Sequence, residues 1–246
     1  MDNAIYTATA GMLTRARALD VTANNLANIN TPGYKRQTLI TSTFQEHMTY
    51  RLSNGQSDQV GATTYGALAA EVFSYEGQGN LWQTDRALDL TIAGDGFFTI
   101  ANPDGSISLT RNGQFGLNPE GFLVSATGGF VLGVDGPIQL GGASDVTVMP
   151  NGQIQTPEGV AANLRVVTPE NPAGLAQNAD GTYVFDGTDV GFTGQVLQNQ
   201  LETSNVDVLD EMISMMEASR AFQMCSQAIR MLDSVNQKTT TEIGRV

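Results

Sequence analysis

The chain has 246 residues, of which 41% are hydrophobic, so it is long and apolar enough to bury the core of one sizeable domain or two small ones. Its formal net charge of −13, from 12 basic and 25 acidic residues, excludes a nucleic-acid surface built on clustered Lys and Arg. Cys225 is the only cysteine, which excludes an intrachain disulfide and a thiolate metal cluster.

The first residues of the chain lack the basic start, continuous apolar stretch and cleavage site of a secretory signal peptide. No run approaches the roughly 18 apolar residues of a membrane span, so we expect no membrane insertion. If the protein leaves the cytoplasm, the expected route is one without a cleaved signal peptide.

Residues 3–30 are predicted to form a helix with apolar or small residues at heptad spacing. The positions of this seam are Ile5, Thr9, Met12, Ala16, Leu19, Ala23 and Leu26. Several of them bury little area, so the helix is expected to be marginal alone and to need a partner. Pro32 and Gly33 are predicted to end it, because proline disfavours helical geometry in the preceding residue.

The middle of the chain consists of two segments that differ in residue composition and pattern. Residues 37–80 mix Gly, Ser, Thr and Gln with short apolar groups, which indicates an extended, partly ordered connector. Residues 81–200 carry many short apolar runs separated by turn dipeptides such as Asn112-Gly113 and Asp180-Gly181, the pattern of an all-β domain. Residues 41–200 hold four basic and sixteen acidic groups, so the acidity belongs to this middle part.

Residues from about 205 to 235 return to a helical pattern. One apolar stripe at three- and four-residue steps contains Val208, Met212, Met215, Ala218, Phe222, Cys225, Ile229, Leu232 and Val235. Helices so far apart in sequence pair only if the middle domain starts and ends at one place. The predicted fold class is therefore α+β, with the terminal helices paired as a coiled-coil-like domain and an all-β domain inserted between them. The expected segments are 1–36, 37–80, 81–200 and 201–246.

Four blocks of the sequence carry a family resemblance. Residues 23–36 read Ala-Asn-Asn-Leu-Ala-Asn-Ile-Asn-Thr-Pro-Gly-Tyr-Lys-Arg, and three further blocks lie at 77–98, 109–124 and 201–222. Together they resemble the flagellar rod, hook and hook-associated proteins over nearly the whole chain. The length fits the rod members that carry a β insertion. Among these, residues 1–6 and 132–138 look more like the proximal rod protein, with the distal rod protein as the alternative.

The resemblance implies a structural subunit of the flagellar basal body, in the periplasmic rod, that polymerises through its terminal helices. The implied partners are other proximal and distal rod subunits, copies of the chain itself, and the flagellar export apparatus during secretion. Neither a cofactor nor an enzymatic activity is expected.

The residues expected at the assembly interface lie on the two helices and in the segment that follows the first. They are Ile5, Met12, Leu19, Ala23, Asn24, Asn25, Leu26, Ala27, Asn28, Pro32, Gly33, Tyr34, Met212, Met215, Phe222, Ile229 and Leu232. The asparagine amides are expected to bond neighbouring subunits; the alternative is that they only cap and solvate the helix end. Simple core filling is the alternative for the methionines.

The sequence offers residues for two other function classes. His47 is the only histidine, and the acidic groups Asp85, Asp89 and Asp95, or Asp186 and Asp189, are the residue types of a glycoside hydrolase but also common turn residues. We therefore expect no catalytic or metal site. A non-catalytic carbohydrate- or surface-binding β module on a helical stalk is the remaining alternative, although it gives no reason for the block at residues 23–36.

Overall fold

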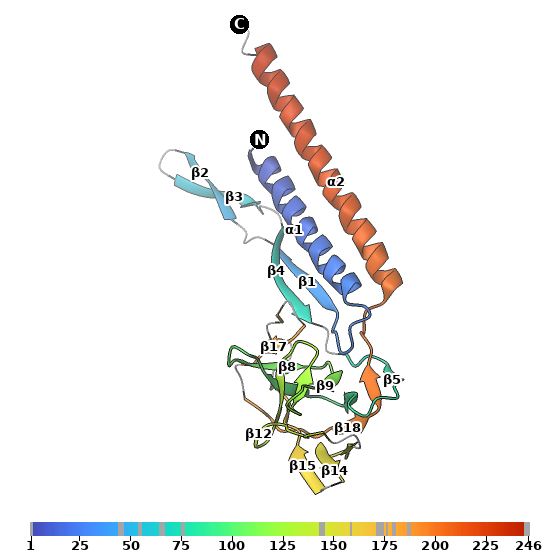
Figure 1. Cartoon of the computed structure of the whole chain (residues 1–246). Helices are drawn as coiled ribbons and strands as arrows, with labels where there is room; N and C mark the ends of the chain where they lie inside the picture. The colour runs from blue at the N-terminus through green and yellow to red at the C-terminus, as the bar shows by residue number, and fades with distance from the viewer. Residues whose placement is uncertain are drawn as a thin grey trace. The chain divides into compact units, whose positions relative to one another are not determined.

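The computed structural model (Figure 1) describes residues 2–43, 47–53, 56–63, 67–74, 77–142, 146–157, 159–170, 175, 177–178, 181–185 and 188–243. It has the predicted α+β class, with α1 (Asp2–Ala27), a many-stranded middle, and α2 (Val208–Lys238) followed by the short π-helix η2 (Thr239–Ile243). The chain divides into a helical unit, residues 1–26, 37–73 and 208–246, and a β unit, residues 27–36 and 74–207.

The helical unit contains four strands besides its helices. The strand β1 (Gln37–Thr43) pairs with β4 (Ala67–Ser74), and β2 (His47–Ser53) pairs antiparallel with β3 (Gln56–Thr63). These strands lie in the stretch predicted to be an extended, partly ordered connector, so that prediction missed their pairing. The alternating apolar signal of a half-buried strand is absent because apolar residues here, such as Ile40 and Val72, are exposed.

Within the helical unit, α1 and α2 lie side by side and run in opposite directions (Figure 1). A Cβ atom added to Gly11 would lie 3.5 Å from Cys225 Sγ. Asn25, fourteen residues later in α1, bonds the carboxylate of Glu211, fourteen residues earlier in α2, as expected of antiparallel helices. No helix among the described residues is long and apolar enough to cross a bilayer.

The face that α1 buries differs from the predicted seam. Thr14, Val21 and Asn25 are the buried residues of α1, whereas Thr9 and Ala23 of the seam are exposed. The predicted seam combined apolar and small residues at heptad spacing, whereas two of the three buried side chains named here, Thr14 and Asn25, are polar. A pattern based on apolar and small residues does not find a buried polar position such as Asn25, which is held by bonds to Gln37 and Glu211.

The β unit is built from short strands, as the sequence predicted for residues 81–200. Its largest sheet has the order β17-β8-β7-β11-β10-β9, with β12 joined to β11 and β16 joined to β7. The β unit also contains a three-stranded sheet, β13-β14-β15, and the pairs β18-β6 and β19-β5. The strand bounds are β5 Leu81–Gln83, β6 Leu90–Ala93, β7 Phe97–Ala101, β8 Ile107–Thr110, β9 Phe115–Leu117, β10 Leu123–Ser125, β11 Phe130–Gly133, β12 Gly136–Pro137, β13 Thr147–Val148, β14 Gln153–Thr156, β15 Gly159–Asn163, β16 Val166–Val167, β17 Tyr183–Val184, β18 Gln195–Gln198 and β19 Gln200–Glu202.

The strand β7 is buried on both of its faces. Phe98 belongs to the main core and meets Phe115 edge-on with ring centroids 5.1 Å apart, whereas Phe97 belongs to a second cluster and meets Tyr183 at 5.2 Å. Alternate residues of a strand point to opposite faces, so this pair places one phenylalanine in each cluster. The start of β7 thereby becomes a rigid base for the residues around it.

Candidate functional site: a buried clasp and an exposed helical surface

Three segments at which the chain enters or leaves the β unit are bound to one another. They are the turn that follows α1, the segment that precedes β5, and the end of β19 with the residues after it. We use the name clasp for the residues that join them: Lys35, Gly77, Gly79, Arg111, Glu202 and Asn205.

Glu202 is the centre of the clasp. Its side chain is 1% exposed, and its Oε1 atom accepts hydrogen bonds from Lys35 Nζ and, at 2.8 Å, from the Gly79 amide. Its Oε2 atom lies 3.4 Å from Nη1 of the buried Arg111. Two buried cations therefore share one carboxylate, and this close pairing is required because an isolated buried ion is very costly.

The two cations are held by further acceptors. Lys35 Nζ donates to the Gly77 carbonyl at 3.0 Å, and Arg111 Nη2 donates to the Gly94 carbonyl at 2.8 Å. The Arg111 guanidinium also lies 5.2 Å from the ring centroid of Phe97, within the range of a cation–π contact. The clasp is thus fixed to the rigid start of β7.

Asn205 completes the clasp through backbone groups. Its Oδ1 atom accepts from the Arg36 amide at 2.7 Å, and its Nδ2 atom donates to the Gly77 carbonyl at 2.9 Å. The Gly33 amide donates to the Glu202 carbonyl at 2.8 Å, so the turn after α1 is bound at both ends. All three segments are in this way locked to one another inside the β unit.

The turn after α1 needs glycine at position 33 for two reasons. Gly33 has φ +70°, and a Cβ atom there would overlap the carbonyl group of Arg111 and lie 2.7 Å from the Asn112 amide nitrogen. Its neighbour Tyr34 is 6% exposed. Both residues are buried within the β unit, and their expected contact with neighbouring subunits stays a prediction.

Asn25 is fully buried in the helical unit and has partners within the chain. Its Nδ2 atom donates to the Gln37 carbonyl at 2.8 Å and to Glu211 Oε2 at 3.2 Å, and its Oδ1 atom accepts from the Gln37 amide at 2.9 Å. Asn24 is exposed and Asn28 is half-buried. For all three asparagines the expected hydrogen bonds to other subunits stay a prediction.

The other expected interface residues lie on the helices or just after α1. Exposed among them are Ala23, Asn24, Ala27, Met212 and Met215, and half-buried are Ile5, Met12, Leu19, Leu26, Asn28, Pro32, Phe222, Ile229 and Leu232. Further large apolar side chains that the prediction did not include are exposed on the same helices: Tyr6, Leu13, Leu209, Ile213, Met216, Met224, Met231 and Val235. We call these exposed apolar side chains, with Met212 and Met215, the outer helical surface.

An open, mainly apolar groove of about 630 Å³ lies between α1 and α2. Its lining residues are Ala4, Thr7, Ala8, Met224, Cys225, Ala228 and Leu232. The small residues of α1 leave room for the groove, and Met224 and Leu232 give it adaptable apolar walls. Together with the outer helical surface it gives the helical unit more exposed apolar area than a solitary soluble helix pair needs.

Two of the candidate catalytic carboxylates contact groups of the chain itself. Asp89 is buried 3.5 Å from Arg86, and the Asp189 carboxylate accepts from the amides of Thr168 and Gly191 at 3.0 and 2.9 Å. Asp186 and the side chain of His47 lie outside the described part of the chain. Among the described residues, no group of three His, Cys, Asp or Glu side chains could hold a metal ion.

The clasp was not predicted from the sequence, although all six of its residues lie in the blocks that carried the resemblance. One signal for them was present in the sequence. Lys35, Arg111 and Glu202 are charged residues in predicted turn or strand segments, and none has a charged residue three or four positions away. One sequence does not show which of these charges meet, because Lys35 and Glu202 lie 167 residues apart.

Comparison with known proteins agrees with this architecture. Three family models match: "Flagella basal body rod protein" over residues 5–35, "Flagellar hook protein FlgE/F/G D1 domain" over 91–185, and "Flagellar basal body rod FlgEFG protein C-terminal" over 197–242. These three ranges contain most of α1, most of the β unit and all of α2.

Several curated proteins are similar along the whole chain. The flagellar basal-body rod protein FlgF of Caulobacter vibrioides is 30% identical over 252 residues, with 100% of both chains covered. FlgG of the same organism is 30% identical, covering 96% of this chain and 98% of its own, and FlgG of Agrobacterium fabrum is 33% identical, covering 94% and 96%. These relatives are structural rod proteins, which confirms the expectation that the chain is not an enzyme. The chain belongs to the family of flagellar basal-body rod proteins, as a structural subunit.

Proposed function

We propose that the chain assembles into the rod through α1 and α2, which pair in a coiled-coil-like manner and present the outer helical surface to neighbouring subunits. The observation that carries this proposal is the row of large apolar side chains exposed on α2, with Met212 48%, Ile213 51% and Met216 53% exposed. Complete burial of such a side chain is favourable by about 1.5–3 kcal/mol, and about half of this is still available for each of the three because each is about half exposed. Neighbours are therefore expected to cover them.

The composition of this surface suits several different partners. Met212, Met215, Met216, Met224 and Met231 are all exposed on α2. Thioether side chains have several rotatable bonds and re-pack readily, so one methionine-rich surface accommodates non-identical subunits. The expected partners are copies of the chain and other proximal and distal rod subunits.

The clasp has a different part in the proposal. It closes the β unit around the segments through which the chain passes to and from the helices, using contacts within one chain only. We infer that the signature block at residues 23–36 acts on assembly indirectly, by fixing these segments, while the contacts between subunits come from exposed residues of α1 and α2.

We place the chain in the proximal part of the rod, with the distal part as the alternative. The end-to-end alignment with FlgF of C. vibrioides supports the proximal position, and the similar identity to FlgG proteins leaves the distal position as the competitor. A periplasmic location and delivery by the flagellar export apparatus without signal cleavage complete the proposal.

Substituting charged residues for apolar ones on the outer helical surface tests this proposal. The double variant Met212→Asp with Met216→Asp is expected to keep a folded monomer, because both side chains are exposed, but to abolish incorporation into rods. The assay is swimming in soft agar and immunodetection in purified basal bodies, in cells that lack FlgF and, separately, in cells that lack FlgG. The wild-type chain should restore swimming only in the former.

The matched control is Val134→Asp, which places the same charge on a valine of the β unit that is 67% exposed. Swimming with the control and none with the double variant supports assembly through the helices. Normal rods built from the double variant would overturn the helix-driven mechanism, and rescue of only the cells lacking FlgG would move the chain to the distal rod.

A further inference from the structure

The methionines of the chain are concentrated on one helix. Of the nine methionines, five lie on α2, and all five are exposed, from 36% for Met215 to 64% for Met224. Met12 of α1 is half-buried, and Met149 is the only methionine in the sequence of the β unit. The thioether is the group of an apolar side chain that mild oxidants convert to a polar sulfoxide. The exposed surface of α2 is therefore distinguished by its chemistry as well as by its hydrophobicity.

Two of these methionines belong to a continuous apolar patch of α2, which we call the methionine patch. It follows the spacing i, i+3, i+4 and i+7 on one face of the helix and consists of the exposed residues Leu209, Met212, Ile213 and Met216. Glu211 and Ala218, which are buried in the helical unit, lie on a different face of α2. In the proposed assembly a neighbouring subunit covers the methionine patch.

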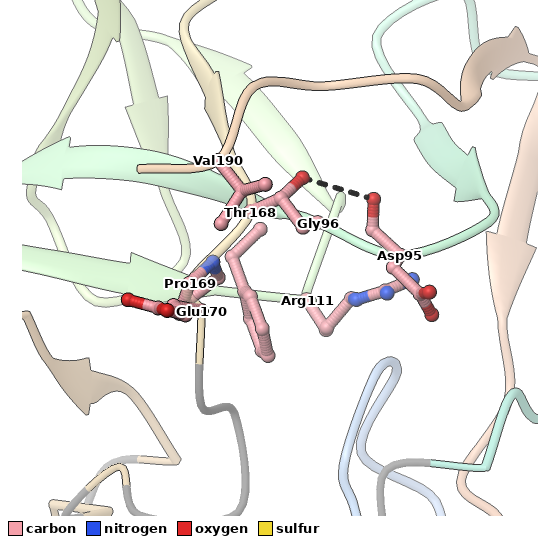
Figure 2. Close-up of a pocket in the computed structure, with 8 residues that line it drawn as sticks. Asp95, Gly96, Arg111, Thr168, Pro169, Glu170 and Val190 are labelled. Atoms are coloured by element: carbon pink, nitrogen blue, oxygen red, sulfur yellow. Dashed lines mark hydrogen bonds between the residues drawn. The ribbon is translucent and has the colours of Figure 1, made fainter. Parts of the chain in front are cut away.

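The β unit offers a contrast to this patch. Its exposed residue Val190 lines a pocket together with the polar residues Asp95, Thr168 and Glu170 (Figure 2). An exposed apolar side chain with polar neighbours is ordinary on a solvated surface, whereas a continuous apolar patch indicates a contact surface. A change of polarity is therefore expected to affect contacts between subunits most strongly in the methionine patch.

We propose that Met212 and Met216 are sites of oxidation by peroxides, and that their sulfoxides keep the subunit from joining the rod. The thioether sulfur attacks one oxygen of hydrogen peroxide, the O–O bond breaks and a sulfur–oxygen bond forms, while the other oxygen leaves with both hydrogens as water. The sulfur loses two electrons, and the peroxide gains them. This inference rests on the proposed assembly through α2, because the modification acts on the surface that assembly covers.

A sulfoxide changes the methionine patch from apolar to polar. Its oxygen is a hydrogen-bond acceptor, whereas the side chains of Leu209 and Ile213 beside it offer no donor. Burial of an acceptor without a donor is unfavourable, so each sulfoxide is expected to weaken the contact with a neighbour by about tenfold.

The oxidation acts on free subunits and is reversible. Subunits already in the rod have their methionine patch covered, so the peroxide does not reach the sulfur atoms. A two-electron reductant that removes the sulfoxide oxygen returns the free subunit to its apolar state. The patch thereby makes the addition of new subunits, and not the finished rod, sensitive to oxidants.

The first test measures the oxidation itself. The purified full chain is treated with hydrogen peroxide, and mass spectrometry of its peptides follows the sulfoxide at each methionine with time, in buffer and in urea. Because Met212 and Met216 are exposed, their rates in buffer are expected to lie within about a factor of two of the rates in the unfolded chain. Rates about tenfold below those of the unfolded chain overturn the proposal and leave helix-driven assembly untouched.

Variants test the consequence for assembly, in cells that lack FlgF. The pair Met212→Leu with Met216→Leu keeps the patch apolar but cannot be oxidised, and under peroxide it is expected to enter new basal bodies about tenfold more than the wild type. The control Met149→Leu removes an exposed methionine of the β unit and should stay as sensitive to peroxide as the wild type. Equal losses of the leucine pair and the wild type under peroxide overturn the proposal.

A second pair separates this inference from the proposed function. Met212→Gln with Met216→Gln imitates the polarity of the two sulfoxides without peroxide and is expected to abolish swimming. If the glutamine pair assembles normally while the aspartate pair Met212→Asp with Met216→Asp does not, the oxidation site falls and helix-driven assembly stands. If both pairs assemble normally, both proposals fall.

Discussion

Replacing Glu202 by alanine is expected to lower the free energy of unfolding of the β unit by about 3–5 kcal/mol, the usual effect of removing one member of a buried ion pair. The variant leaves Lys35 and Arg111 buried without their shared counter-charge, and it removes the acceptor of the Gly79 amide. Glu202→Gln, which keeps the shape but not the charge, is expected to fall between the variant and the wild type.

Urea unfolding of the full chain, followed by tryptophan fluorescence, measures this effect. Trp82 is the only tryptophan and lies in β5, where Leu81 pairs directly with Glu202 of β19. Glu120→Ala removes an exposed carboxylate of the same type and should leave the midpoint unchanged. An unchanged midpoint for Glu202→Ala would show that the clasp does not stabilise the β unit.

Replacing Gly33 by alanine is expected to destabilise the β unit by about 2–5 kcal/mol. A left-handed backbone costs a residue with a Cβ atom about 1–2 kcal/mol, and overpacking typically costs a further 1–3 kcal/mol. The new methyl group would overlap the main-chain carbonyl of Arg111, which has no rotamer by which to move aside. The turn after α1 would then be displaced from the clasp.

The variant Gly105→Ala separates the cost of the left-handed backbone from the cost of overpacking. Gly105 has φ +85°, similar to the +70° of Gly33, but a Cβ atom at Gly105 would meet nothing within 4 Å. Its unfolding free energy should therefore fall only by the backbone cost. If both alanine variants lost the same stability, measured by the same urea titration, the close approach of Gly33 to Arg111 would be of no energetic importance.

Much of the fold could be predicted because local patterns determine it. The alternation of Leu88, Leu90 and Ile92 reflects interactions between near neighbours in sequence, and both predicted helices are present. The tight hairpin turn predicted at Asn112-Gly113 is absent, because β8 and β9 do not pair with each other and the Gly113 carbonyl instead accepts from the Leu90 amide at 3.0 Å. The predicted end of the first helix at Pro32-Gly33 lies within a few residues of the end of α1 at Ala27.

The rest depends on contacts between residues far apart in sequence. Gly33 was predicted only as a turn residue, because no residue near it in sequence indicates that it packs against the Arg111 carbonyl. Likewise, the polar residues Asn25 and Glu211 are buried in the helical unit while large apolar residues such as Ile213 are exposed, so apolar periodicity did not identify the buried face. Exposed strands such as β1 give no alternating signal at all.

The central claim is that the clasp is folded within one chain, whereas α1 and α2 become fully stable only when neighbouring subunits cover them. Hydrogen exchange on the purified monomer tests this claim. The Gly33 and Arg36 amides, bonded to the Glu202 carbonyl and to Asn205 Oδ1, should be protected to the same degree as the Leu90 amide of the β core, and α1 and α2 should exchange faster. Rapid exchange at Gly33 and Arg36, or helices as strongly protected as the β core before assembly, would contradict the claim.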